Sequence, residues 1–303
     1  MLTFTKENKY VKILYDLLLR WGITIMANDA KRHIIIPKGT KAIECKQFCD
    51  NLDLQSIVLP EGLERIDEEA FRGCIALKEI VVPKSVERIE FMAFEGCESL
   101  ESVKFLSEDT ELGWCVFNGC KSLEEIILPS GIDCIESGAF SGCSALKEIV
   151  IPKYVDHIEE CAFVGCSALK SVEFLGEDTK LWWSVFSDCS SLENIKLPKN
   201  VEWIDDGLFE DCESLTEVVI PKRIENIGCC AFAGCTSLKT LVLPKGIERI
   251  EVDAFCDCEN LILFCGDEAP TEEWEQGWDN DVDVVVFGAD ETDRKKLLSD
   301  GGI

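Results

Sequence analysis

Phenylalanine recurs at an interval of 23 residues through most of this 303-residue chain. The recurring positions are Phe48, Phe71, Phe94, Phe117, Phe140, Phe163, Phe186, Phe209, Phe232 and Phe255. A fixed period of about 20–50 residues is the sequence signature of a solenoid, whose single coils cannot bury their own apolar side chains. Stacking ten coils would create one continuous core, so the period predicts one elongated domain.

Other residue types keep the same interval. Cysteine lies three positions after each column phenylalanine except the first, where Asn51 stands; the column is Cys74, Cys97, Cys120, Cys143, Cys166, Cys189, Cys212, Cys235 and Cys258. Proline opens eight of the units, and Leu106 and Leu175 replace it in the other two. We therefore expect an N-terminal cap at 1–36, ten repeats at 37–266, and a C-terminal cap and tail at 267–303.

Within each unit, apolar residues two positions apart predict a strand. Val103 and Phe105 show this spacing in the unit that begins at Pro83. The next proline would end the pairing, because it has no N–H to donate. If Ile80 and Val82 point inward in the preceding unit, Val81 must point outward.

The unit pattern P-x-x-V-x-x-I-x-x-x-A-F-x-x-C-x-x-L-x-x-I-x-I resembles the BspA-like short leucine-rich repeats. The resemblance implies a β-rich leucine-rich repeat solenoid, a right-handed curved superhelix with a parallel sheet on its concave face. It also implies binding to other macromolecules rather than catalysis, and a column of Asn or Cys that satisfies backbone groups in a bend. Family members are often found on bacterial surfaces.

Charge and cysteine usage narrow the choice of partners. The formal net charge is −28, from 58 acidic and 30 basic residues. This speaks against nucleic acid and anionic membranes, which are polyanions, and permits a basic partner. The repeat accounts for nine of the 18 cysteines, and we expect buried, reduced thiols there, because parallel side chains suit disulfide geometry poorly.

The N-terminal segment Ile13–Ala27 is apolar but contains Asp16 and Arg20. A signal peptide would need an uncharged core, so an amphipathic capping helix is the better interpretation. Together with the thiols this favours a cytoplasmic location, whereas the family resemblance favours the cell surface. Both locations stay open. We expect His33–Ile36 to lead into the first unit as a strand.

At the other end, Leu261–Phe264 is expected as the last repeat strand and Val282–Phe287 as a further strand that covers the open edge. Pro270, Trp274 and Trp278 would form an irregular cap, and residues after Ala289 a loosely held tail. No apolar run is long enough to insert into a membrane.

Two units resemble each other more closely than either resembles the other units. Leu106–Leu128 and Leu175–Leu197 both lose the proline, gain Glu-Asp-Thr and carry tryptophan, at Trp114 and at Trp182 with Trp183. The features that the two units share are either neutral variation inherited from a duplicated block or a sign of two equivalent exposed aromatic sites.

Catalytic and metal-binding motifs are scarce. The two histidines, His33 and His157, accompany no nucleophile elbow, phosphate loop or zinc-protease motif, so no enzyme and no cofactor is expected. Cys115, Cys161 and Cys230 each precede a column cysteine by five residues, which is not zinc-ligand spacing. Asp279, Asp281 and Asp283 resemble the start of a calcium loop, but Val284 stands where that loop needs glycine.

Two surfaces remain as candidate binding faces. Two acidic columns, which begin at Glu44 and Glu64, lie on the return stretch and would form a solvated face or dock a basic partner. The outward positions of the concave strands are Val58, Val81, Lys104, Ile127, Val150, Glu173, Lys196, Val219 and Val242. Six are β-branched apolar residues, which either suit a sheet or mark a binding groove.

These observations predict a non-enzymatic, monomeric scaffold that binds a protein or peptide on its concave face. The alternative is an exported bacterial surface adhesin that contacts host or matrix macromolecules.

Overall fold

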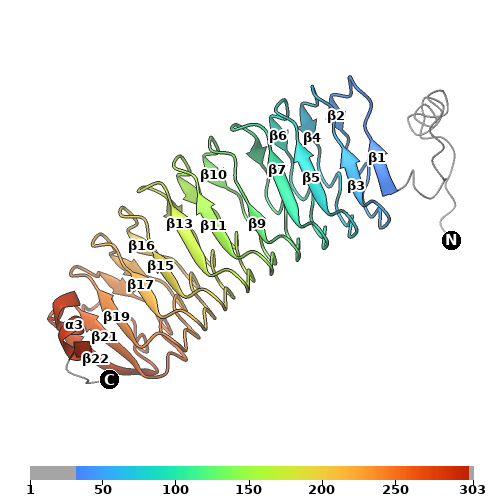
Figure 1. Cartoon of the computed structure of the whole chain (residues 1–303). Helices are drawn as coiled ribbons and strands as arrows, with labels where there is room; N and C mark the ends of the chain where they lie inside the picture. Colours follow the sequence, from blue (N-terminus) through green and yellow to red (C-terminus); the bar gives the residue numbers. More distant parts are fainter. Residues whose placement is uncertain (1–31, 300–303) are drawn as a thin grey trace, which may run out of the picture.

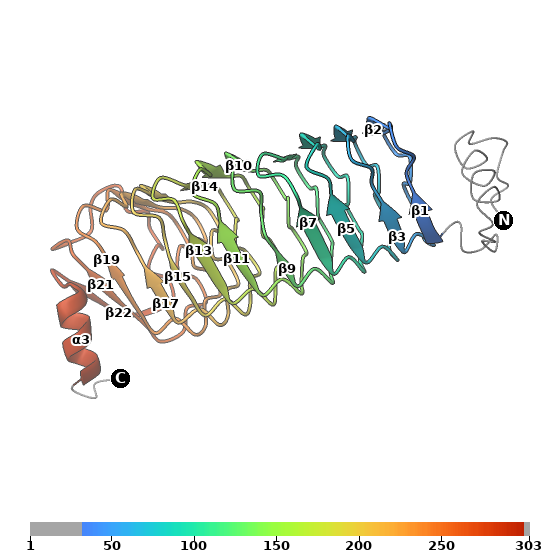
Figure 2. The same cartoon turned by 45° about the horizontal axis from the view of Figure 1, so that its top comes forward.

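The computed structural model describes residues 32–299, which wind into an elongated stack of coils (Figures 1 and 2). One strand of each coil, which we call the main strand, runs parallel to the main strands of adjacent coils, and these strands pair in the groups β1-β3-β5-β7-β9, β11-β13, β15-β17 and β19-β21. The main strands are β1 (His33–Ile35), β3 (Ser56–Val58), β5 (Glu79–Val82), β7 (Ser102–Phe105), β9 (Glu125–Ile126), β11 (Glu148–Ile151), β13 (Ser171–Phe174), β15 (Asn194–Lys196), β17 (Glu217–Val219), β19 (Thr240–Leu243) and β21 (Leu261–Cys265). The parallel solenoid expected from the 23-residue period is confirmed.

The return stretch of each coil forms a second layer of two-residue strands. These return strands are β2 (Ala42–Ile43), β4 (Arg65–Ile66), β6 (Arg88–Ile89), β8 (Glu111–Leu112), β10 (Cys134–Ile135), β12 (His157–Ile158), β14 (Lys180–Leu181), β16 (Trp203–Ile204), β18 (Asn226–Ile227) and β20 (Arg249–Ile250). They also pair in parallel, for example Arg65 with Arg88. Every coil therefore encloses a core between two sheets.

Phenylalanine rings form the axis of that core. Consecutive column rings stack with centroids 5.1 to 6.0 Å apart, from Phe48 to Phe255. All are fully buried except Phe48, which is partly buried. The register explains the stacking, because residues 23 positions apart face each other across adjacent coils.

The column cysteines are buried, as expected, and each makes the same hydrogen bond. Each Sγ donates to the backbone carbonyl of the phenylalanine 26 residues earlier, at 3.0 to 3.3 Å. The accepting carbonyl belongs to the preceding coil, so the thiols connect coils. The expectation that this column satisfies backbone groups is confirmed.

A tight bend precedes each column phenylalanine. The residue two positions before it has positive φ in all ten coils, and it is not glycine in eight of them, for example Glu69 (52°) and Met92 (54°). Cys115, Cys161 and Cys230 occupy this bend, which explains their spacing of five from the column cysteines.

The ends of the stack match the expected strands. β1 pairs with β3, and β22 (Val282–Phe287) pairs in parallel with β21 after one irregularity in register. Trp278 meets Phe255 edge-on at 6.4 Å and Trp274 at 4.9 Å, so the two indoles close the column of rings. The capping helix expected at Ile13–Ala27 lies outside the described residues.

The expectation of a loose tail after Ala289 is wrong. Glu291–Ser299 form helix α3, which packs against β19 and β21 (Figures 1 and 2). Its start is capped reciprocally: Asp290 Oδ1 accepts from the N–H of Thr292 at 2.7 Å, and Asp293 Oδ2 accepts from the N–H of Asp290 at 2.9 Å. Among residues 32–299, no helix is long and apolar enough to span a membrane.

Candidate interaction surface

The outward positions of the main strands form one continuous column, and we call the surface around them the main-strand face. Strand pairing places Val81 beside Lys104, Val150 beside Glu173, and Lys196 beside Val219. Inward neighbours such as Ile80 and Val82 are buried, which confirms the alternation. The outward column thus consists of Val58, Val81, Lys104, Ile127, Val150, Glu173, Lys196, Val219 and Val242.

Most members of the outward column are solvent-exposed. Ile127, which directly follows the short strand β9, is 86% exposed, and Val58, Val81, Val150 and Val219 are also exposed. Val242 is half-buried. Apolar side chains of this column are therefore exposed in five coils and half-buried in a sixth.

The column continues beyond Val242 to a residue that the repeat analysis did not include. Phe264 pairs with Val242 and occupies the same outward position, yet it is only 2% exposed. Helix α3 packs on this strand, so the chain itself covers the outward column at Phe264, whereas Val286 of β22, which pairs with Phe264, is exposed. No repeat pattern marks this contact, because α3 follows the last repeat.

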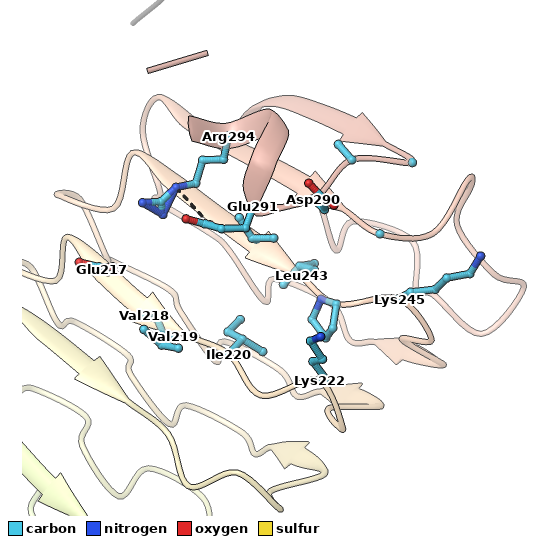
Figure 3. Close-up of a pocket in the computed structure, with 15 residues that line it drawn as sticks. Glu217, Val218, Val219, Ile220, Lys222, Leu243, Lys245, Asp290, Glu291 and Arg294 are labelled. Carbon is cyan, nitrogen blue, oxygen red and sulfur yellow. Dashed lines mark ion pairs between the residues drawn. The ribbon is translucent and has the colours of Figure 1, made fainter. Parts of the chain in front are cut away.

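A pocket of about 880 Å³ opens between α3 and the uncovered end of the face (Figure 3). Val219 and Val242 of the outward column line it, together with Arg294 of α3 and two lysines, Lys222 and Lys245. Of these, only Val219 and Val242 were identified from the sequence as binding residues. Three carboxylates, those of Glu217, Asp290 and Glu291, also line the pocket, so its acidic and basic side chains are equal in number.

The three predicted aromatic residues lie elsewhere. Trp114, Trp182 and Trp183 are all exposed, and they follow the return strands β8 and β14. Trp114 stacks on Phe91 of the preceding coil, with centroids 4.7 Å apart and planes at 3°. Trp182 lies 6.5 Å from the ring of His157. They are not part of the outward column, and their role in binding stays a prediction.

The acidic columns lie on the return stretch and are partly neutralised within the coil. Arg65, Arg88 and Arg249 each form an ion pair with the acid two residues later. Burial raises the pKa of Glu136 and of Asp205, which have no such arginine. Pairs across coils, such as Lys41 with Glu64 at 2.5 Å and Arg223 with Glu202 at 3.4 Å, offset further repulsion.

Both histidines contact polar side chains at the surface. His157 contacts Asp156 and lies 3.9 Å from Glu159, and His33 Nδ1 lies 2.8 Å from Ser56 Oγ at the exposed start of the stack. Within the described range, no hydroxyl or thiol is hydrogen-bonded to the ring of His157. Both contacts fit surface residues.

One group of potential metal ligands was not apparent from the sequence. Cys256 Sγ lies 3.6 Å from Asp257 Oδ2 and 3.7 Å from Asp281 Oδ2. Burial and the neighbouring carboxylates raise the pKa of Cys256 to about 11, which favours the thiol over the thiolate that binds metals. Asp281, one of the three aspartates that resemble the start of a calcium loop, therefore meets cysteine and aspartate from the preceding coil.

Comparison with known proteins agrees with the repeat architecture. The family model described as "BspA type Leucine rich repeat region" matches residues 27–147 and 133–262, in six copies. A search of curated proteins gave no match.

Similar solved structures come from several bacteria. The pneumococcal vaccine antigen PcpA is 20% identical, with a TM-score of 0.52 over 84% of this chain and 79% of that one. A leucine-rich repeat protein from Eubacterium ventriosum is 20% identical, with a TM-score of 0.50 over 84% and 88%. A leucine rich cell surface protein from Faecalibacterium prausnitzii is 24% identical, with a TM-score of 0.47 over 87% and 89%. At these identities the likeness concerns the fold, and the family match covers most of the sequence: this chain belongs to the BspA type leucine-rich repeat family.

Proposed function

We propose that this protein is a non-enzymatic scaffold that binds a protein or peptide through the outward column of its main-strand face. The exposure of apolar side chains on adjacent strands, with Ile127 at 86%, carries the proposal. Contiguous apolar surface is uncommon on soluble monomers and marks interaction sites. The lysines and glutamate between the apolar positions would add specificity at little cost in solubility.

The test combines two substitutions at the centre of the column. Ile127→Glu with Val150→Glu should leave folding intact, because both side chains point away from the core. It should weaken capture of the native partner by about tenfold or more, because buried apolar contacts concentrate binding energy. Capture from the source cells, followed by titration calorimetry with the purified partner, measures the change.

Two controls locate the interface. Leu52→Glu with Val252→Glu introduces the same charges at exposed apolar positions off the main-strand face, and should not affect binding. Glu87→Lys with Asp133→Lys alters an acidic column of the return stretch. Loss of capture in this last variant alone would place the interface on the return side and contradict the proposal.

A second candidate is an exported bacterial surface protein that presents the same face to host or matrix macromolecules. Membership in the BspA type family favours it, whereas the buried column thiols favour the cytoplasm. Protease treatment of intact source cells separates the two: cleavage of the protein before lysis supports the surface, and protection until lysis supports the cytoplasm.

A further inference from the structure

Aromatic side chains are exposed on the return side of the stack, in the coils of β12, β14 and β16. Trp182 is 44% exposed and Trp203 is 52% exposed, and the ring of His157 lies 6.5 Å from that of Trp182. His157 and Trp203 begin their return strands, and Trp182 lies two residues after Lys180, which begins β14. Strand alternation therefore turns all three rings to the same face, and we call them the aromatic patch. Contiguous exposed apolar surface marks an interaction site more often than single exposed residues do.

Carboxylates surround the aromatic patch. The 23-residue period places Glu159 and Asp205 on either side of Trp182, in the preceding and the following coil. The three coils, each taken from one residue before the return strand to two residues after it, contain six acidic residues and one lysine: Asp156, Glu159, Glu160, Glu202, Asp205, Asp206 and Lys180. Arg223 pairs with Glu202 at 3.4 Å, which leaves five acids for one lysine. The patch therefore carries a local excess of negative charge.

Other coils show which side chain satisfies an acid at the position of Glu159 and Asp205. The arginine that begins each of β4, β6 and β20 pairs with the acid two residues later, at 2.8 to 3.2 Å. In β12 and β16 that first position holds His157 and Trp203. Within residues 32–299, neither Glu159 nor Asp205 has a lysine or arginine within ion-pair distance. An aromatic ring thus stands where the repeat elsewhere carries a cation, and the carboxylate beside it can accept one from outside.

We infer that the aromatic patch binds arginine side chains of a basic peptide segment, with guanidinium groups on the indoles of Trp182 and Trp203 and hydrogen bonds to Glu159 and Asp205. A planar guanidinium stacks on an indole face and donates two parallel hydrogen bonds to a carboxylate. The peptide would supply the charge that an arginine supplies within β4, β6 and β20. This surface lies on the return side, so the inference is independent of the proposed function of the main-strand face.

Charge favours a basic peptide over an uncharged ligand. A sugar ring could cover an indole, but it would leave the local excess of negative charge without a counter-charge. The net charge of −28 would also draw a cationic segment towards the protein.

The spacing of the coils sets the spacing of the arginines. Glu159 and Asp205 lie two coils apart, which is roughly 10 Å at the separation of paired strands. An extended peptide covers this distance in about three residues. The preferred ligand therefore carries two arginines three positions apart.

Fluorescence anisotropy with labelled peptides tests the inference on the full-length protein. The probe is an octapeptide with arginine at its third and sixth positions and glycine elsewhere, and matched probes carry lysine or the neutral isostere citrulline there. Salt of about 150 mM shortens the Debye length to about 8 Å and suppresses long-range attraction. We expect the arginine probe to bind about threefold more tightly than the lysine probe, and about tenfold or more tightly than the citrulline probe.

Two pairs of substitutions assign the binding to the aromatic patch. Trp182→Leu with Trp203→Leu should weaken the arginine probe about tenfold, because both stacking faces are lost. Glu159→Gln with Asp205→Asn should weaken it about fivefold, and both side chains keep an oxygen for the backbone N–H groups that they accept from. Circular dichroism verifies that each variant is folded.

Matched controls separate the patch from general electrostatic attraction. Glu87→Gln with Glu248→Gln removes two exposed carboxylates from the return side, in coils without an exposed indole at the start of the return strand. Trp114→Leu removes an exposed indole three coils before that of Trp183. Both controls should bind the arginine probe as the wild type does.

Four outcomes would overturn the inference: no binding of the arginine probe up to about 1 mM protein, equal affinity for the arginine and citrulline probes, wild-type affinity in Trp182→Leu with Trp203→Leu, or equal losses in the patch and control carboxylate variants. Binding of maltohexaose that depends on the two indoles, without binding of the arginine probe, would assign the patch to a sugar.

Failure of this inference is distinguishable from failure of the proposed function. Ile127→Glu with Val150→Glu should weaken capture on the main-strand face and leave the affinity for the arginine probe unchanged. Trp182→Leu with Trp203→Leu should have the opposite effect.

Discussion

Most side chains in the core of this protein pack against the equivalent residue one coil away. Parallel pairing in register produces this arrangement. Each favourable contact between two coils is therefore repeated along the stack. Phe117 and Phe140 stack at 5.6 Å, and Cys143 donates to the Phe117 carbonyl at 3.2 Å. A thiol suits this position because it fills a small apolar space and still offers one weak donor.

Because the column thiols are buried, the free energy of unfolding should vary with pH in the alkaline range. Burial raises the pKa of Cys143 to about 12, whereas a thiol in the unfolded chain titrates near about 8.5. Between these values the unfolded chain loses its proton and the folded chain keeps it, so the free energy of unfolding falls as pH rises.

We therefore expect Cys143→Ala to flatten the decline by up to about 1.4 kcal/mol per pH unit in this window. Urea titrations at pH 7.5, 9 and 10.5 measure the slope, and Cys45→Ala, at an exposed position, is the control. An unchanged slope in Cys143→Ala would show that the buried thiol does not couple folding to pH.

Among the elements, α3 differs most from the repeat. It lies outside the 23-residue pattern and covers Phe264, which would otherwise extend the exposed column. Backbone hydrogen bonds from Thr292 hold the pKa of Asp290 below its usual range, as expected for a carboxylate that caps a helix. The cap stabilises both the helix and one wall of the pocket.

Removing this cap should loosen α3 without affecting the repeats. Asp290→Ala should cost about 0.5–2 kcal/mol of local stability, seen as hydrogen exchange about fivefold faster in residues 291–299. Asp290→Asn retains a capping side chain and should exchange as the wild type does. Equal exchange in all three proteins would mean that packing on β19 and β21, and not the cap, holds the helix.

The whole molecule is a one-dimensional stack in which each coil contacts only its neighbours. Its stability is therefore the sum of coil and interface contributions, and the position of a substitution matters. The ring of Phe140 stacks between Phe117 and Phe163 and is fully buried, whereas Phe48, at the start of the ring column, is only partly buried.

Phe140→Ala should leave a cavity and cost about 3–5 kcal/mol, and Phe48→Ala should cost less because less of the ring is removed from water. Denaturant titrations of the two variants measure the difference. Equal losses at both positions would count against the nearest-neighbour stack.

The repeat made much of this fold predictable. The period placed every main strand, the spacing of two between Val103 and Phe105 set which side chains point inward, and the apolar run Val282–Phe287 identified β22. The return strands are only two residues long, and an alternation of apolar and polar residues cannot be recognised over so short a segment. The left-handed bend before each phenylalanine holds residues as different as Glu69 and Met92, so no residue type marks it.

Sequence alone determined the coil, its columns and the exposed apolar residues, because a repeat encodes contacts between equivalent positions in adjacent coils. The tertiary structure decided that α3 covers the column at Phe264. Arg294 and Val219 are far apart in the chain and share no period, and they meet because α3 folds back over β19 and β21. Such a contact depends on how a non-repetitive segment packs on a finished surface, which local spacing does not encode.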